Sequence, residues 1–246
     1  MKEQNTSEET QGFRLNKFVA HCGITSRRKA ADLVKSGEIL VNDAVEINPS
    51  YMVQETDKVS YKGQLLTPEQ KKVYILLNKP KDVITSLSDE NGRRTVIDIV
   101  GSKVKERIYP VGRLDYKTTG LLLLTNDGDL AKKLSHPSHS IPKIYQVALD
   151  RNLDPSDLEK IRAGFELGDG KVDVDWVQHP GNELDIVNVE IHMGRNRIVR
   201  RIFEHFGYKV LKLDRTYYAG LTKKDLPRSW FRNLTEKEII MLKHFT

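Results

Sequence analysis

Hydrophobic positions near the start of the chain recur with a helical period. In "RLNKFVAHCGI", Leu15, Phe18, Val19 and Cys22 lie on one helix face, and Gly23 then interrupts the pattern. The pattern predicts a short first helix.

A second short helix and two pairs of strands are predicted next. Ser26 is a suitable N-cap for "RRKAADLVKSG", where Ala30, Leu33 and Val34 share a face and Gly37 ends the helix. "EILVN" and "AVEIN" are predicted strands around an Asn-Asp turn, and "KVSYKGQLL" adds a strand pair at a glycine turn. A unit this small is typical of an appended module.

Composition shifts divide the chain into three parts. Residues 1–11 are polar and lack periodicity, which predicts a mobile tail. The polar, proline-containing stretch "YKGQLLTPEQKK" predicts a domain boundary. We therefore expect a small domain over residues 12–70 and a larger one over residues 71–246.

The larger region alternates irregularly between strand and helix patterns. Predicted strands are "VYILLNKP", "GLLLLTND", "KIYQVALD", "DIVNVEIHM" and "YKVLKLDRTYY". Predicted helices are "DLAKKLSHP", capped by Asp129, then "DPSDLEKIRAGF", "NRIVRRIFEHFG" and "TEKEIIMLKHF", the last with Thr235 and Glu238 as a capping box. This order predicts an α+β fold, with a mostly antiparallel mixed sheet flanked by helices.

Charge and cysteine content narrow the class of protein. Lys and Arg number 40 against 34 Asp and Glu, a net charge of +6, which is compatible with a nucleic-acid partner but does not require one. Cys22 is the single cysteine, so no intrachain disulfide can form, as suits a reducing cytosol. No apolar run approaches the roughly 20 residues that cross a bilayer, and the first residues do not resemble a signal peptide. We expect a cytoplasmic protein without membrane attachment.

Several kinds of site are not supported by the sequence. No glycine-rich phosphate loop and no dinucleotide-binding fingerprint occurs, and neither Ser nor Cys lies in a nucleophile elbow. His136 and His139 lack Cys or acidic partners at ligand spacing, which favours a solvated loop over a metal site. We expect no cofactor and no metal.

One carboxylate stands just before an unusually apolar row. In "GRLDYKTTGLLLLTNDG", alternation directs Arg113 and Asp115 to one side and Leu114 into the core. The four leucines predict a strand buried on both faces, which is a rigid support for the adjoining loop. The residues alone leave two alternatives, a positioned catalytic acid or a surface turn with a salt bridge.

The segment "MGRNRIVRRIFEHFGYKVLKLDR" carries seven Lys or Arg against two acids. Its cations either form a solvated helix face, with Arg200 paired to Glu204, or bind phosphates. The sequence pattern leaves both open.

Taken together, these motifs resemble the RsuA/RluB-type pseudouridine synthases, which modify uridine in ribosomal RNA. "GRLD" with "TGLLLLTNDGDL", the Lys-x-Tyr of "KIYQV" and the block "GRNRIVRRIFEHFGYKVLKLDR" occur in the family's order. The first domain resembles the alpha-L RNA-binding domain of the ribosomal protein S-four type, and the last segment resembles the RluB-like, large-subunit branch. Ile198 and Met193 depart from the family pattern, which puts a polar role at position 198 in doubt.

The resemblance implies specific roles in the larger domain. Asp115 would be the catalytic residue, with Arg200 as the partner that keeps it charged in a closed apolar pocket. Tyr145 would stack on a flipped-out uracil, with Leu213 (or Leu211) beneath it, and Arg113 would support the loop or the RNA. Whether Asp115 attacks C6, attacks C1′ or removes a proton from C2′ stays open.

The resemblance also implies a ribosomal RNA partner, either free or in an assembly intermediate, and we expect the chain to act as a monomer. The expected RNA contacts are Arg14, Lys17, Arg27, Arg28, Lys29, Arg195, Arg197 and Arg201. Two other functions stay open as alternatives. One is a non-catalytic rRNA-binding assembly factor, and the other is a hydrolase of a sugar bond, which would need a second positioned acid.

Overall fold

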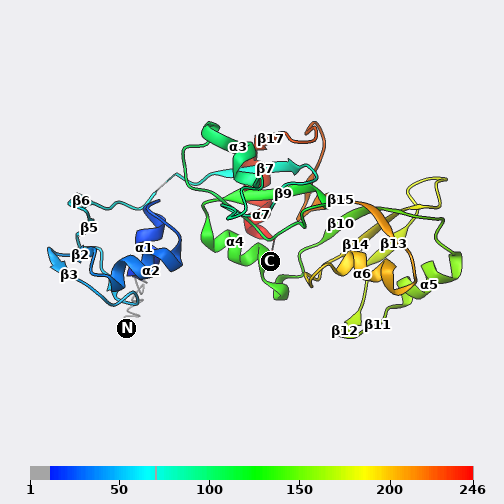
Figure 1. Cartoon of the computed structure of the whole chain (residues 1–246), viewed down its shortest axis with the longest axis horizontal. Helices are drawn as coiled ribbons and strands as arrows, with labels where there is room; N and C mark the ends of the chain where they lie inside the picture. Colours follow the sequence, from blue (N-terminus) through cyan, green and yellow to red (C-terminus); the bar gives the residue numbers. More distant parts are fainter. Residues whose placement is uncertain (1–11, 70, 246) are drawn as a thin grey trace, which may run out of the picture. The chain divides into compact units, whose positions relative to one another are not determined.

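The computed structural model describes residues 12–69 and 71–245 (Figure 1). The chain separates into two compact units between Lys71 and Lys72, and each is described by itself below. The polar tail predicted for residues 1–11 lies outside the described residues.

The smaller unit combines two short helices with short strands, as the hydrophobic pattern predicts. Ser26 caps the second helix by accepting a hydrogen bond from the Lys29 N–H, which confirms the N-cap prediction. Side chains of both helices and the sheet form one core. The elements are β1 (Phe13–Arg14), α1 (Leu15–His21), α2 (Arg27–Lys35), β2 (Ile39–Val41), β3 (Ala44–Val45), β4 (Met52–Val53), β5 (Val59–Tyr61) and β6 (Gln64–Leu65).

The larger unit is built around a mixed, mostly antiparallel sheet. Its central order is β13-β14-β10-β15-β9-β7-β17, with β16 beside β15 and β8 beside β9. The pair β15–β9 is parallel, and the other pairs in this sheet are antiparallel. The strands of this sheet are β7 (Tyr74–Lys79), β8 (Tyr109–Pro110), β9 (Thr119–Thr125), β10 (Lys143–Leu149), β13 (Trp176–Gln178), β14 (Ile186–Ile191), β15 (Val210–Tyr218), β16 (Leu221–Thr222) and β17 (Phe231–Asn233); β11 (Phe165–Leu167) and β12 (Gly170–Val172) form a separate hairpin.

Helices cover both faces of this sheet, so the predicted α+β class is confirmed. Side chains of α3, α5 and α6 belong to one apolar cluster, and those of α4 and α7 belong to another. The helices are α3 (Val96–Val100), α4 (Gly128–Ser135), α5 (Pro155–Ala163), α6 (Ile198–His205) and α7 (Glu236–His244), with short 3-10 turns η1 (Gly101–Lys103) and η2 (Pro137–His139).

The leucine row of β9 is buried on both faces, as predicted. Leu122 and Leu124 belong to one apolar cluster, whereas Leu121 and Leu123 belong to the other, and all four are 0% exposed. Because alternate side chains of a strand point to opposite faces, one strand contributes to both cores. The loop that precedes β9 is therefore mounted on the most buried part of the sheet.

Two strands that are distant in the sequence meet closely at Gly120. This residue pairs with Arg215 across the parallel β9–β15 contact, at φ +108°. A Cβ at Gly120 would overlap the backbone of Arg215. Glycine is therefore required for the contact that joins the halves of the sheet.

One predicted helix cap is wrong. Asp127, rather than Asp129, caps α4, and its carboxylate accepts a hydrogen bond from the Leu130 N–H at 3.2 Å. The helix begins at Gly128, so Asp129 lies in its first turn, where an acid favours the helix dipole. Thr235 and Glu238 form the predicted capping box of α7.

Candidate active site

The Asp115 loop joins β8 to β9 and alternates between core and solvent. Leu114 is 6% exposed and packs in the core, whereas Arg113 and Asp115 are exposed. The predicted orientation of these three residues is confirmed. The closed, dry surroundings expected for Asp115 are not found, because its side chain lies where solvent reaches it.

A buried lysine fixes the backbone of this loop. Lys79 ends β7 and is 0% exposed. Its Nζ donates to the carbonyl oxygens of Pro80 (3.1 Å), Asp115 (3.2 Å), Tyr116 (3.3 Å) and Thr118 (2.8 Å). Burial lowers the pKa of Lys79 to about 8, and the nearby Asp115 charge opposes this shift. One ammonium group thus holds three carbonyls around the candidate acid.

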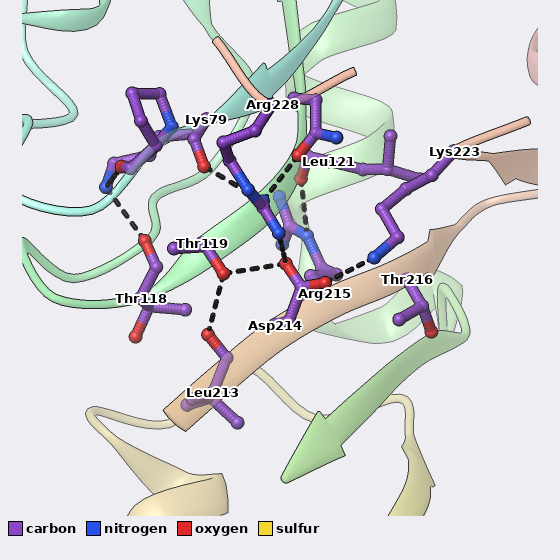
Figure 2. A network of polar contacts seen from close by, with 12 residues as sticks. Lys79, Thr118, Thr119, Leu121, Leu213, Asp214, Arg215, Thr216, Lys223 and Arg228 are labelled. Atoms are coloured by element: carbon purple, nitrogen blue, oxygen red, sulfur yellow. Dashed lines mark hydrogen bonds and ion pairs between the residues drawn. The ribbon is translucent and has the colours of Figure 1, made fainter. Parts of the chain in front are cut away.

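A second polar network supports the same loop from β15 (Figure 2). Asp214 accepts a hydrogen bond from Thr119 Oγ1 at 2.7 Å and pairs with Arg228 at 2.9 Å and with Lys223. Arg228 also donates to the carbonyl of Lys79 at 3.2 Å. Burial alone would raise the pKa of Asp214, but its bonds to Arg228, Lys223 and Thr119 outweigh burial and lower the pKa. The network joins β7, β9 and β15 beside the loop.

A cavity of about 330 Å³ opens beside this loop. Tyr145 on β10 is 8% exposed and Leu213 on β15 is 5% exposed, so both present mostly buried side chains to the cavity. Pockets of this size are typical of small-ligand sites, and both apolar and polar side chains line this one. The residues singled out from the sequence that line it are Arg113, Asp115, Tyr145, Arg195, Arg197 and Leu213.

Sequence reasoning missed two cations in this cavity wall. Lys143 Nζ donates to the carbonyls of Ile141 (2.6 Å) and His192 (2.9 Å), and burial, with a smaller effect of Arg215, lowers its pKa to about 8. Arg215 is 3% exposed and donates to the Leu121 carbonyl at 2.7 Å. The available signal was a cation at one end of a strand pattern, as at Lys143 in "KIYQV" and at Lys79 in "LLNKP", whereas Arg215 lies inside its strand and gave no such signal.

Arg200 lies near Asp115 without an ion pair to it among the contacts of the described residues. Both line a second cavity of about 570 Å³, on the α6 side of the loop. Arg200 is 9% exposed, and its Nη1 donates to the Val210 carbonyl at 3.0 Å. Burial, then the charge of Arg197, lowers the pKa of Arg200, while Asp115 opposes the shift. The alternative that pairs Arg200 with Glu204 is wrong, since Glu204 contacts Arg197 at 3.5 Å.

The remaining arginines of the basic segment are engaged within the fold. Arg195 donates to the carbonyls of Gly170 (3.0 Å) and Lys171 (2.8 Å). Arg201 makes a bidentate ion pair with Asp169, at 2.8 and 2.5 Å, and this pair lowers the pKa of Asp169 to about 2. Only part of this segment therefore has cations available to a ligand.

The basic residues of the smaller unit lie on its surface. Arg14, Arg27, Arg28 and Lys29 are exposed, and the last three form the first turn of α2. Lys17 is half-buried, with its Nζ 4.7 Å from the centre of the Phe13 ring. These residues belong to a unit separate from the cavities.

Neither a metal centre nor a membrane span emerges from residues 12–69 and 71–245. No group of three or more His, Cys, Asp or Glu in these ranges has the geometry to hold a metal ion. Their helices are too short or too polar to cross a bilayer.

Comparison with known proteins identifies the family. The RNA pseudouridylate synthase family matches residues 73–205, and the S4 domain family matches residues 13–59. Ribosomal large subunit pseudouridine synthase B of Bacillus subtilis is 41% identical over 235 residues, which cover 94% of this chain and 95% of that protein. The protein of the same name from Buchnera aphidicola is 35% identical over 89% of this chain and 90% of its own length.

A solved structure supports the same assignment. The crystal structure of a pseudouridylate synthase, 27% identical in sequence, superposes with a TM-score of 0.67 over 94% of this chain and 99% of its own. The likeness spans both units, and it agrees with the family matches to each of them. The chain therefore belongs to the RNA pseudouridylate synthase family and carries an S4 domain before its synthase domain.

Proposed function

We propose that this enzyme isomerises uridine to pseudouridine in large-subunit ribosomal RNA, with Asp115 as the catalytic residue and the target base flipped into the 330 Å³ cavity. The observation that supports this most is the meeting of Asp115, Tyr145 and Leu213 at one cavity. They come from a loop and two strands up to 98 positions apart, and each has the residue type that the chemistry requires.

The reaction requires a carboxylate and no redox partner. The N1–C1′ bond breaks, the uracil turns, and C5 joins C1′, while C5 loses a proton and N1 gains one. A carboxylate can serve as a nucleophile that later leaves, or as the base that removes a proton. Asp115 is exposed at the cavity, so an incoming nucleotide can reach its oxygens without displacing other side chains.

The other residues then have distinct tasks. The Tyr145 ring stacks on the flipped uracil, and Leu213 packs against the base within the cavity. Lys79 keeps the loop backbone in place, which is the kind of preorganisation that lets a single group act at the correct atom.

The large-subunit target is supported by the names of the relatives from B. subtilis and Buchnera aphidicola. The S4 domain supports RNA binding outside the active site, since exposed cations suit phosphates without selecting bases. Pseudouridine mapping of large- and small-subunit RNA after incubation with the enzyme tests this target. Conversion confined to small-subunit RNA would contradict it.

The catalytic assignment is tested by Asp115→Asn, a nearly isosteric change at an exposed position. We expect single-turnover conversion to fall below detection, with RNA affinity unchanged within about twofold, because the amide can serve neither as nucleophile nor as base. Asp225→Asn is the matched control, because Asp225 is an exposed turn residue that lines neither cavity. Measurable conversion by Asp115→Asn, with amide hydrolysis excluded, would place the chemistry elsewhere.

A further inference from the structure

The second cavity adjoins the active site on the α6 side of the Asp115 loop. Asp115 and Arg197 line both cavities, so the two meet at the candidate acid. The second cavity has a volume of about 570 Å³. Its walls are Lys81, Asp115, Tyr116, Lys117, Arg197, Arg200, Val210 and Leu211. Four cations thus surround a single carboxylate.

The cations at its mouth are available to a ligand. Lys81 and Lys117 are exposed, and neither has a hydrogen-bond or ion-pair partner among the described residues. Arg197 has a long contact to Glu204, at 3.5 Å, and its side chain stays 50% exposed. The hydrogen bond from Arg200 to the Val210 carbonyl directs its side chain into the fold, so Arg200 adds positive charge at the buried wall of the cavity. This arrangement attracts an anion.

Apolar and aromatic surface faces solvent in the same cavity. Tyr116 is 42% exposed and Leu211 is 64% exposed, which is costly for side chains without a partner. The Tyr116 backbone is nevertheless fixed, because its carbonyl accepts bonds from Lys79 Nζ (3.3 Å) and from the Asp82 N–H (2.9 Å). An exposed ring on a fixed backbone, beside lysines, is a combination that suits binding of unpaired nucleotides.

We propose that this second cavity holds a nucleotide adjoining the target uridine, with its base on Tyr116 and Leu211 and its phosphate against Lys81, Lys117 and Arg197. The proposal rests on the function proposed above, because it takes the target uridine to occupy the first cavity. The target uridine and its neighbour then lie in different cavities on the two sides of Asp115, so the two bases do not stack on each other. An enzyme of this form selects substrates by the neighbour of the uridine as well as by the uridine itself.

A double-mutant cycle between protein and RNA tests the stacking. The probe is the shortest fragment of large-subunit RNA in which the wild-type enzyme forms pseudouridine. An abasic nucleotide replaces, in turn, each nucleotide of the RNA loop that contains the target uridine. We expect Tyr116→Ala to weaken binding about tenfold and Tyr116→Phe to preserve it. At one RNA position next to the target uridine, removing the base should weaken binding by the wild-type enzyme to a similar extent. The same removal should leave binding by Tyr116→Ala unchanged.

A second pair of variants tests the phosphate contacts. Lys81→Gln with Lys117→Gln should lower the slope of log affinity against log salt by roughly 0.7 for each single-strand phosphate that these lysines neutralise in wild type. Lys237→Gln, on the exposed surface of α7 outside both cavities, is the control and should leave the slope unchanged. Thermal melts of each variant verify folding.

The outcomes separate this proposal from the proposed function. Additive effects of Tyr116→Ala and every abasic position, together with normal conversion by wild type, would overturn the neighbour site alone. Coupling at a position that does not adjoin the converted uridine would overturn it as well. Coupling at one loop position without conversion of any uridine would instead contradict the proposed function.

Discussion

Positive charge has opposite uses in the first turn of α2 and in the core of the larger unit. In the smaller unit, Arg27, Arg28 and Lys29 are exposed on the first turn of α2. In the larger unit, Lys79 and Arg215 are almost fully buried and direct their N–H groups at backbone carbonyls. Cations in a sequence can therefore either lie exposed to a ligand or stabilise the backbone from within the core, and burial distinguishes the two roles.

The difference has an energetic basis in each unit. A buried cation is stable only when polar groups replace its water, so Lys79 gathers four carbonyl oxygens. Burial nevertheless lowers its pKa to about 8. Cations on the first turn of a helix oppose the helix dipole, at about 0.3–1 kcal/mol each. The first turn of α2 contains no acid to offset them. The first turn of α2 is therefore less stable than one that carries acids.

The largest effect should follow neutralisation of the exposed cluster. Replacing Arg27, Arg28 and Lys29 with Gln should weaken RNA binding roughly 30- to 100-fold at moderate salt, and should lower the salt slope by roughly 2 to 3, because up to three phosphates are no longer neutralised. Binding titrations at several salt concentrations measure both quantities. Thermal stability should stay constant or rise slightly because the dipole conflict is removed. An unchanged salt slope would show that these cations do not contact RNA.

An intermediate effect should follow removal of the buried cation at the loop. Lys79→Met should slow single-turnover conversion about 10- to 100-fold with little change in RNA affinity, since the carbonyls of Asp115, Tyr116 and Thr118 lose a common donor. Equal losses of affinity and of rate would show that Lys79 acts on binding rather than on loop position.

The same variant has a signature in the dependence of stability on pH. The folded-state pKa of Lys79, about 8, lies below its ordinary value of 10.5. Between these values the unfolded chain binds a proton that the folded chain releases, so the free energy of unfolding rises with pH. Wild type should gain about 2 kcal/mol relative to Lys79→Met from pH 8 to pH 10. Lys143, with a similar pKa, is present in both proteins and cancels in the comparison.

The smallest effect is expected at a cation that is paired on the surface. Arg201→Gln breaks the ion pair with Asp169, in which the Arg201 side chain is 29% exposed. Exposed pairs contribute about 0–1 kcal/mol, so unfolding should shift by no more than this amount. RNA affinity should change less than about twofold, because the guanidinium is already engaged. A loss comparable to that of the α2 cluster would mean that RNA displaces Asp169.

Much of the fold followed from local patterns, and the parts that did not depend on distant contacts. The helices α1, α2 and α7 and the leucine strand were predictable because caps and alternation are encoded within a few residues. The two-residue strands β1, β4, β8 and β16 were not, since they are too short to show a period. The equally short β3 and β6 were predicted because an Asn-Asp or a glycine turn marks the hairpin of each.

The candidate site divides in the same way. The orientation of Arg113, Leu114 and Asp115 followed from alternation. The role of Lys79 did not, because a fully buried lysine is rare and its acceptors extend to Thr118, 39 positions away. The pairing of Arg201 with Asp169, 32 positions apart, likewise depends on where the β11–β12 hairpin lies against α6.

The position of β15 in the sheet has a consequence for how the enzyme is made. β15 lies between β10, which carries Tyr145, and β9, which follows Asp115, and it is synthesised after both. Its contact with β9 closes a loop of about 95 residues, a slow step in folding because distant segments must find one another. A nascent chain that ends before Val210 already contains Asp115 and Tyr145, but not the strand that joins them. The proposed site around Asp115 and Tyr145 can therefore assemble only after β15 has been synthesised.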